Sequence, residues 1–223
     1  MDEIYHFIEK HIMGVLTHCE SARFSEMRPK RVDSNLYSYH LKKLLKEHYI
    51  IKDGKDYRLS PLGLQYVTRL SVRTGRPAVQ AKITASILIK NSKNQILLTK
   101  RNRQPFIHTW SLPRGKTRSD EPIAQATERV LIDEAGVRGR EFKHIGDAYL
   151  RCDEDGVLIS NIFTHVFTAK IDDDTPLQSH TKWFDVGEVD AHKMPMTPGM
   201  DRIPQMVDAS KGKHFFAEIT EVL

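Results

Sequence analysis

The chain has 223 residues, of which 39% are hydrophobic and 28% are charged, a composition typical of soluble globular proteins. The length is comfortable for two domains, and no apolar run approaches the roughly 18 residues of a membrane span. The acidic, amphipathic start differs from a signal peptide, and Cys19 and Cys152 match neither a disulfide framework nor a zinc pattern, so we expect a cytoplasmic protein without a membrane partner.

The net charge of +5 lies in the first third of the chain. Residues 1–80 contain 14 Lys and Arg against nine Asp and Glu, whereas the remaining residues contain 20 of each sign. Such an asymmetry favours a polyanionic partner for the first third, and double-stranded DNA before a membrane surface.

The first 70 residues read as four helices and a hairpin. Helical periodicity predicts helices over residues 3–17, 21–29, 35–48 and 60–70. Between the last two, residues 50–59 read as two short strands around an Asp-Gly turn, which is a strong hairpin signal.

The third predicted helix has two different faces. Asp33 or Ser34 can cap its start, and Ser60 can cap the fourth helix. The inward face of the third helix consists of Tyr37, Leu41, Leu44, Leu45 and His48. Its outward face is polar and basic and consists of Asn35, Ser38, Tyr39, Lys42, Lys43 and Lys46.

This order of helices and hairpin resembles a winged helix-turn-helix domain, which we place at residues 1–70. The resemblance implies that the third helix enters a DNA major groove while the hairpin touches the backbone. Asn35, Ser38 and Tyr39 would then read bases. The residues that would bind phosphates are Lys42, Lys43, Lys46, Lys52, Lys55 and Arg58. The alternatives are a solvated basic surface and an element that contacts another protein, including a second copy of this chain in a homodimer.

A linker is expected at residues 71–80, because Gly75 and Pro77 break the periodicity there. Residues 81–223 form the second expected domain. Its expected strands lie at 83–90, 95–101, 142–152 and 158–171. Residues 182–189 and a helix near 198–210 close the domain.

Residues 115–137 hold a glycine-led loop and a helix that carries carboxylates at helical spacing. Positions 130, 133 and 134 share one face of that helix. Three acidic residues there would make an oxygen-lined site suited to Mg²⁺. Asp133 and Glu134 are present, but position 130 is Val.

This stretch resembles the Nudix box of the Nudix hydrolases. The residues in register are Gly115, Glu121, Arg129, Leu131, Glu134, Gly136 and Val137. Asp133 replaces one glutamate conservatively, and Val130 replaces another outright. The approach to the box also resembles the family at Trp110 and Pro113 and departs from it at His108 and Arg114, where glycine is usual.

The resemblance implies a domain with an α/β/α sandwich and a mixed sheet, and hence an α+β chain of two domains. It also implies metal-dependent hydrolysis of a pyrophosphate linkage, with Mg²⁺ or Mn²⁺ bound by Asp133, Glu134 and the Gly115 carbonyl. The implied catalytic set is Glu134 and Asp133, with Arg129 to orient a carboxylate and Glu121 to support the loop. The candidate phosphate-binding residues are Arg101, Arg103, Arg114 and Lys116.

Val130 has two interpretations. It extends an apolar helix face with Ile123, Thr127 and Leu131, or its role passes to a carboxylate from elsewhere. The acidic runs that could supply one are 153–155 and 172–174, although both are more typical of solvated turns.

Two functions follow from these features. The first is a pyrophosphohydrolase of low or specialised activity on a nucleoside-diphosphate-linked substrate, with an appended DNA-binding module. The alternative is a transcriptional regulator whose degenerate Nudix domain senses a nucleotide such as ADP-ribose without hydrolysing it. Among substrates, ADP-ribose, dinucleotides, modified nucleoside triphosphates and nucleotide sugars all stay open.

Overall fold

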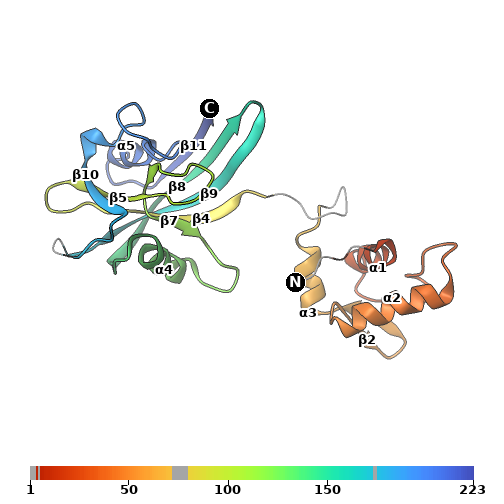
Figure 1. Cartoon of the computed structure of the whole chain (residues 1–223). Helices are drawn as coiled ribbons and strands as arrows, with labels where there is room; N and C mark the ends of the chain where they lie inside the picture. Colours follow the sequence, from red (N-terminus) through yellow and green to blue (C-terminus); the bar gives the residue numbers. More distant parts are fainter. Residues whose placement is uncertain (1–3, 5, 72–79, 173–174) are drawn as a thin grey trace. The chain divides into compact units, whose positions relative to one another are not determined.

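The computed structural model describes residues 4, 6–71, 80–172 and 175–223, and Figure 1 traces their helices and strands. The chain divides into two compact units, Met1–Val79 and Gln80–Leu223. Most of the expected linker at 71–80 lies outside the described residues. Within the described ranges, none of the helices combines the length and apolarity that crossing a membrane requires.

The first unit contains three helices and a small antiparallel sheet. The helices are α1 (Phe7–Thr17), α2 (Ser34–Lys46) and α3 (Pro61–Val67). The strands are β1 (Ala22–Arg23), β2 (Ile50–Asp53) and β3 (Asp56–Leu59), in the order β1-β3-β2. A single apolar core joins them, in which Ile8 and Ile12 of α1 and Tyr37 and Leu44 of α2 are fully buried.

Side-chain caps set the starts of α2 and α3. The Asp33 carboxylate accepts hydrogen bonds from the backbone N–H groups of Asn35 at 2.8 Å and Leu36 at 3.1 Å, and these bonds lower the pKa of Asp33. Ser60 accepts from the Gly63 N–H at 3.0 Å. Each cap satisfies donors that have no partner within their own helix.

Two expectations for this unit are wrong. Residues 21–29 form no helix, because Ala22 and Arg23 pair with Tyr57 and Asp56 as strand β1 and the following residues make turns. Strand pairing with the hairpin thus outweighs the local helical pattern. His48 is exposed, because α2 ends at Lys46 and His48 turns the chain with φ 59°.

The second unit is built on a five-stranded mixed sheet in the order β11-β8-β9-β4-β7. Neighbours are parallel in the pairs β11–β8 and β4–β9 and antiparallel in the other two. Its strands are β4 (Lys82–Leu88), β7 (Arg114–Lys116), β8 (Arg140–Glu154), β9 (Val157–Lys170) and β11 (Phe215–Val222).

A second, three-stranded sheet has the order β10-β5-β6. Its strands are β5 (Gln95–Lys100), β6 (Trp110–Ser111) and β10 (Thr181–Asp185), and a 3-10 turn η1 (Val186–Glu188) follows the last. The strands β4 and β5 are joined by the expected turn, yet they belong to different sheets.

One helix lies on each side of the large sheet, α4 (Ile123–Ala135) on one and α5 (Arg202–Ala209) on the other (Figure 1). Residues of β4 alternate between them. Ile87 packs in a cluster with Leu131 of α4, whereas its neighbour Leu88 packs in a cluster with Ile203 of α5. The unit is therefore α+β with helices on both faces of a mixed sheet. Strand β11 was not expected from the sequence.

Helix α3 packs closely on the chain at Tyr49, because a Cβ added to Gly63 would lie 2.1 Å from the Tyr49 carbonyl oxygen. A substitution at Gly63 therefore tests this packing. We expect Gly63→Ala to destabilise the first unit by about 1–3 kcal/mol through overpacking. Both tryptophans, Trp110 and Trp183, lie in the second unit. The urea transition should therefore move to lower concentration by far-ultraviolet circular dichroism and stay in place by tryptophan fluorescence.

The matched control is Gly14→Ala, because an added Cβ at Gly14 of α1 meets nothing within 4 Å. Inside a helix this change should stabilise the unit by roughly 0.5–1 kcal/mol. Equal effects of the two substitutions would contradict the packing of α3 against Tyr49.

Candidate functional site

Strand β7, which has Gly115 at its centre, lies directly against helix α4. A Cβ added to Gly115 would approach Val130 Cγ2 to 2.9 Å, so only glycine lets the strand come this close. Val130 is completely buried and packs with Ile87 and Leu131. Of the expected apolar helix face, Thr127 and Leu131 are buried, whereas Ile123 is 39% exposed.

Arg129 joins the loop to the helix. Its Nε donates to Glu121 Oε2 at 2.8 Å, and its Nη2 donates to the same carboxylate and, at 3.0 Å, to the Lys116 carbonyl. Its Nη1 donates to Asp133 Oδ2 at 3.1 Å. One guanidinium therefore fixes two carboxylates and the end of β7, and these interactions raise the pKa of Arg129.

Glu121 supports the loop. Besides Arg129 it binds the backbone N–H of Arg118 at 2.8 Å, and its side chain is only 11% exposed. The Arg129 hydrogen bonds lower the pKa of Glu121 to about 2, from an ordinary 4.5. The charged carboxylate therefore holds the loop in place through its hydrogen bonds. It does not line the cleft described next.

A cleft of about 650 Å³ opens beside α4, within the range of small-molecule sites. It brings together the candidate residues Arg101, Arg103, Arg114, Gly115, Lys116, Arg129, Asp133 and Glu134. Val130 also lines it. A smaller cavity of about 160 Å³ adjoins Arg101, Arg114 and Glu134 and adds His180, whose Nε2 lies 3.1 Å from the Glu134 carbonyl oxygen.

Several residues of the cleft were not expected from the sequence, namely Lys82, Thr84, Gln104, Pro105, Phe106, Thr117, Arg118, Ser160 and Ile162. Arg118 lies inside the box sequence, so its position could have been found. Thr84, Ser160 and Ile162 come from β4 and β9, and only the order of strands brings them to the cleft.

Three guanidinium groups converge on this cleft. Burial, together with the positive charge of Arg101, lowers the pKa of Arg114 to about 10. Burial and Arg103 likewise lower the pKa of Arg101. Arg103 Nη2 lies 3.3 Å from Glu134 Oε1, but in the described part of the chain neither Arg101 nor Arg114 has an ion pair within 4 Å. The cleft holds more positive charge than its carboxylates neutralise.

Asp133 and Glu134 are the acidic residues among the described residues of the cleft. The run 153–155 lies outside the lining, and Asp153 binds Arg151 at 2.7 Å. Asp172 binds Arg140 at 2.7 Å, and Asp173 and Asp174 lie outside the described residues. In the described ranges, no further carboxylate lines the cleft to replace the acidic side chain that position 130 lacks.

Two carboxylates and the Gly115 backbone offer the hard oxygen donors that Mg²⁺ or Mn²⁺ takes. Asp133 and Glu134, each of which also contacts an arginine, are the residues that would hold one divalent ion. Its donor set is poorer by one carboxylate than a helix with three acids would provide.

The candidate nucleic-acid interface lies on the first unit. Asn35, Tyr39, Lys42 and Lys46 of α2 are exposed, with Tyr39 at 64%, and Ser38 is half-buried. On the hairpin, Lys52, Lys55 and Arg58 are also exposed.

Lys43 differs from the other lysines of α2. Its Nζ donates to the carboxylate of Glu9 at 3.0 Å, and Glu9 is 1% exposed. His40 Nδ1 contacts the same oxygen at 2.8 Å. The hydrogen bond to Glu9 raises the pKa of Lys43. Its ammonium is thus the internal partner of a buried charge, which restricts its use for an external phosphate.

Comparisons with known proteins agree with this geometry. The family model of the NUDIX domain matches residues 81–205. A mutator MutT protein from Bacillus halodurans is 16% identical, with a TM-score of 0.50 over 62% of this chain and 89% of that one.

Further structural similarities have lower TM-scores. The NUDIX domain of NrtR from Shewanella oneidensis, solved in complex with ADP ribose, is 17% identical, with a TM-score of 0.48 over 66% of this chain and 96% of that one. A MutT protein from Methanosarcina mazei Go1 is 19% identical, with a TM-score of 0.48 over 61% of this chain and 100% of that one.

The Arg129 contacts predict a pH dependence of stability. Because the folded-state pKa of Glu121 is depressed, its contribution is fully present above the unfolded pKa and is lost as pH falls from about 5 toward 2. We expect Glu121→Gln to lower the urea midpoint at pH 7 and to flatten its fall between these pH values. Tryptophan fluorescence measures both effects.

Glu128→Gln is the control, because Glu128 is exposed on the same helix and makes no ion pair among the described residues. Parallel pH curves for wild type and Glu121→Gln would show that Arg129 does not hold Glu121 in solution.

Proposed function

The chain belongs to the NUDIX domain family, and from this premise we propose that its second unit binds a nucleoside-diphosphate-linked molecule and hydrolyses it slowly with a divalent metal. The observation that carries the proposal is the convergence of Arg101, Arg103 and Arg114 on a cleft that also holds the carboxylates of Asp133 and Glu134.

The arginines favour a ligand with adjacent phosphates. The pKa of Arg114 falls because its charge is buried and because the positive charge of Arg101 is close to it. A diphosphate relieves that repulsion, and guanidinium groups bind its oxygens in a bidentate way. Lys116 and Arg118, also on the cleft, add positive charge for the same anion.

The rest of the cleft suits a nucleoside. Phe106 is partly buried on its wall and offers a ring on which a base can stack. Gln104, Thr84 and Ser160 offer hydrogen-bonding groups around it. The volume of about 650 Å³ accommodates a ligand larger than a phosphate ion.

Slow turnover follows from Val130. Asp133 and Glu134 would hold the ion, which when bound stabilises phosphate charge and lowers the pKa of a water. Arg129 keeps Asp133 in place, and the arginines orient the anion. An aliphatic residue at position 130 can neither bind a cation nor accept a proton, which by analogy with the loss of one catalytic group costs about 10²–10³-fold in rate.

The second candidate function is a regulator whose cleft binds the nucleotide as a signal. It is favoured by the basic first unit, whose order of helix, strand, helix, hairpin and helix supports a winged helix-turn-helix assignment for residues 1–70. In this proposal α2 enters the major groove of DNA with Asn35, Ser38 and Tyr39 facing bases. Lys42, Lys46 and the hairpin cations bind phosphates.

Restoring the carboxylate tests the proposed hydrolysis. We expect Val130→Glu to raise kcat on a hydrolysed substrate by up to about 10²-fold, because the new acid acts on charge that develops during the reaction. Chromatography of the two monophosphate products (AMP and ribose 5-phosphate from ADP-ribose), on ADP-ribose and a nucleotide panel with Mg²⁺ or Mn²⁺, measures the effect.

Val130→Gln controls for the change of volume at this buried position and should give no gain. Glu134→Gln should abolish metal-dependent turnover in both backgrounds. Turnover of Glu134→Gln equal to that of the wild type would overturn the assignment of the site.

Charge neutralisation on α2 tests the DNA proposal. We expect Lys42→Gln with Lys46→Gln to weaken duplex binding, and to reduce the slope of log K against log salt by about 0.9 for each lost phosphate contact. Fluorescence anisotropy with labelled duplex across a salt series gives both quantities.

Lys93→Gln, an exposed lysine of the second unit, is the control. Repeating the titration with saturating ADP-ribose separates the two functions, because a regulator requires ligand and DNA to alter each other's affinity by the same factor. Absence of duplex binding by the wild type at low salt would refute the DNA proposal.

A further inference from the structure

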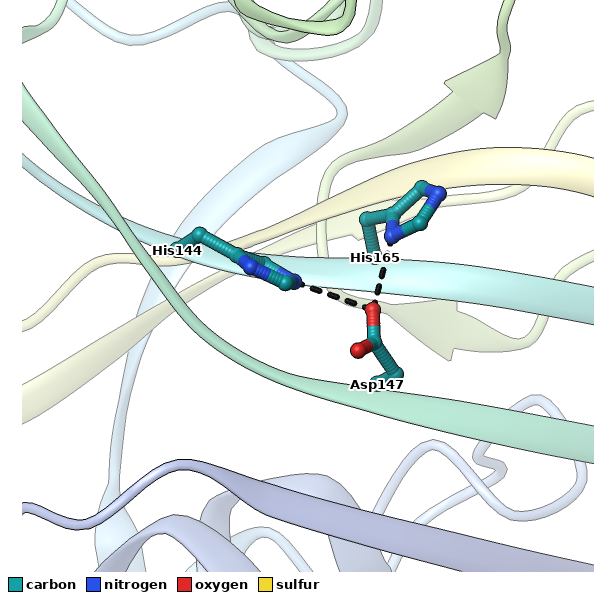
Figure 2. Close-up of side chains that lie close together, drawn as sticks. All are labelled: His144, Asp147 and His165. Carbon is teal, nitrogen blue, oxygen red and sulfur yellow. Dashed lines mark hydrogen bonds and ion pairs between the residues drawn. The ribbon is translucent and has the colours of Figure 1, made fainter.

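Three histidines surround one aspartate on the large sheet, away from the cleft. His144 Nε2 lies 2.9 Å from Asp147 Oδ1, and His165 Nδ1 lies 2.7 Å from the same oxygen (Figure 2). The third, His214, brings its Nε2 to 3.4 Å from Asp147 Oδ2. Of the described residues that line the cleft, none belongs to this group.

A β-bulge creates the cluster. His144 pairs with Phe167 and Gly146 with Val166, so Ile145 is one extra residue in β8. In a regular strand, residues three apart point to opposite faces. The extra residue restores His144 to the face of Asp147. Asp147 pairs directly with His165 on β9, and β11 runs beside β8 with Phe216 opposite Asp147.

The cluster lies on the same face of the large sheet as α4, but farther along the sheet, on β8 and β9. Along the row, His165 pairs with Ala85 and Ala85 with Gly115, so His165 lies two strand spacings, or about 10 Å, from the box strand. Asp147 lies one strand further away, on β8. The side chains remain open to solvent, with exposed fractions of 18% for Asp147, 30% for His165 and 37% for His144. An ion can therefore reach them without opening the core.

We propose that His144, Asp147, His165 and His214 form a binding site for a divalent transition-metal ion of the Zn²⁺ class. Imidazole nitrogens with one carboxylate are ligands that Zn²⁺ takes, whereas Mg²⁺ prefers oxygen. The facing atoms of His144, Asp147 and His165 all lie within 4.8 Å of one another. A tetrahedral Zn²⁺ site holds its ligand atoms roughly 3.4 Å apart, so small ring rotations suffice.

Because the ligands come from different strands, a bound ion would stabilise the second unit. Two come from β8, one from β9 and one from the residue that precedes β11. A bound ion crosslinks the two central strands to the start of the edge strand. Because the ion binds the folded chain and not the unfolded one, it stabilises the second unit.

The test is calorimetric titration of Zn²⁺ into the full, untagged and chelator-treated chain, with excess Mg²⁺ present. We expect saturable binding of one equivalent and a rise of the thermal transition followed by tryptophan fluorescence. Asp147→Asn and His165→Ala should each weaken binding at least about tenfold, since even supporting groups of metal sites have effects of this size. His144→Ala, at a more exposed ring, serves if either variant fails to fold.

His192→Ala is the matched control, because His192 is an exposed histidine of the same unit. It should bind Zn²⁺ as the wild type does, and so should Glu134→Gln, which separates this site from the cleft. The proposal is overturned if the wild type does not bind Zn²⁺, if the cluster variants retain wild-type affinity, or if Glu134→Gln abolishes binding.

Discussion

The guanidinium of Arg129 joins three pieces of chain that the fold would otherwise leave independent. It binds Glu121 in the loop, Asp133 one turn along α4 and the carbonyl of Lys116 at the end of β7. Since each acceptor is held by a rigid donor fork, the loop, strand and helix keep one geometry. The cleft depends on that geometry, because its arginines stand on the segments that lead into β7 while its carboxylates stand on α4.

The packing of β7 against α4 explains how the fold tolerates an aliphatic residue in an acidic motif. Val130 leaves no room for a side chain at position 115, and its isopropyl group completes the apolar cluster around Ile87 and Leu131. The valine therefore leaves no packing defect at position 130, and Arg101, Arg103 and Arg114 line the cleft beside it.

Much of this organisation could be predicted from local signals. The register of the box located α4, its glycine end and the contact of Arg129 with Asp133, because they depend on spacing within one helix. The bonds from Arg129 to Glu121 and to the Lys116 carbonyl depend on how the loop folds back, and the sequence did not predict them. Strand β11, the separation of β4 and β5 into two sheets and the strand at residues 22–23 depend on distant pairing, so local patterns could not predict them. The histidine cluster was missed for a related reason, since a bulge at Ile145 reverses the alternation by which a sequence assigns faces.

The edge strand β11 has a consequence for the order in which the chain matures. Phe215 pairs with Gly146, 69 residues earlier, and the pairing is parallel. Contacts so distant form late, because a long loop must close first. During synthesis, β8 therefore presents an open row of backbone N–H and C=O groups until residues 215–222 have emerged, while the first unit, whose partners are close in sequence, can already be folded. A nascent chain held at that stage offers β8 as a template for strand addition by another copy, which exposes the ribosome-bound intermediate to aggregation.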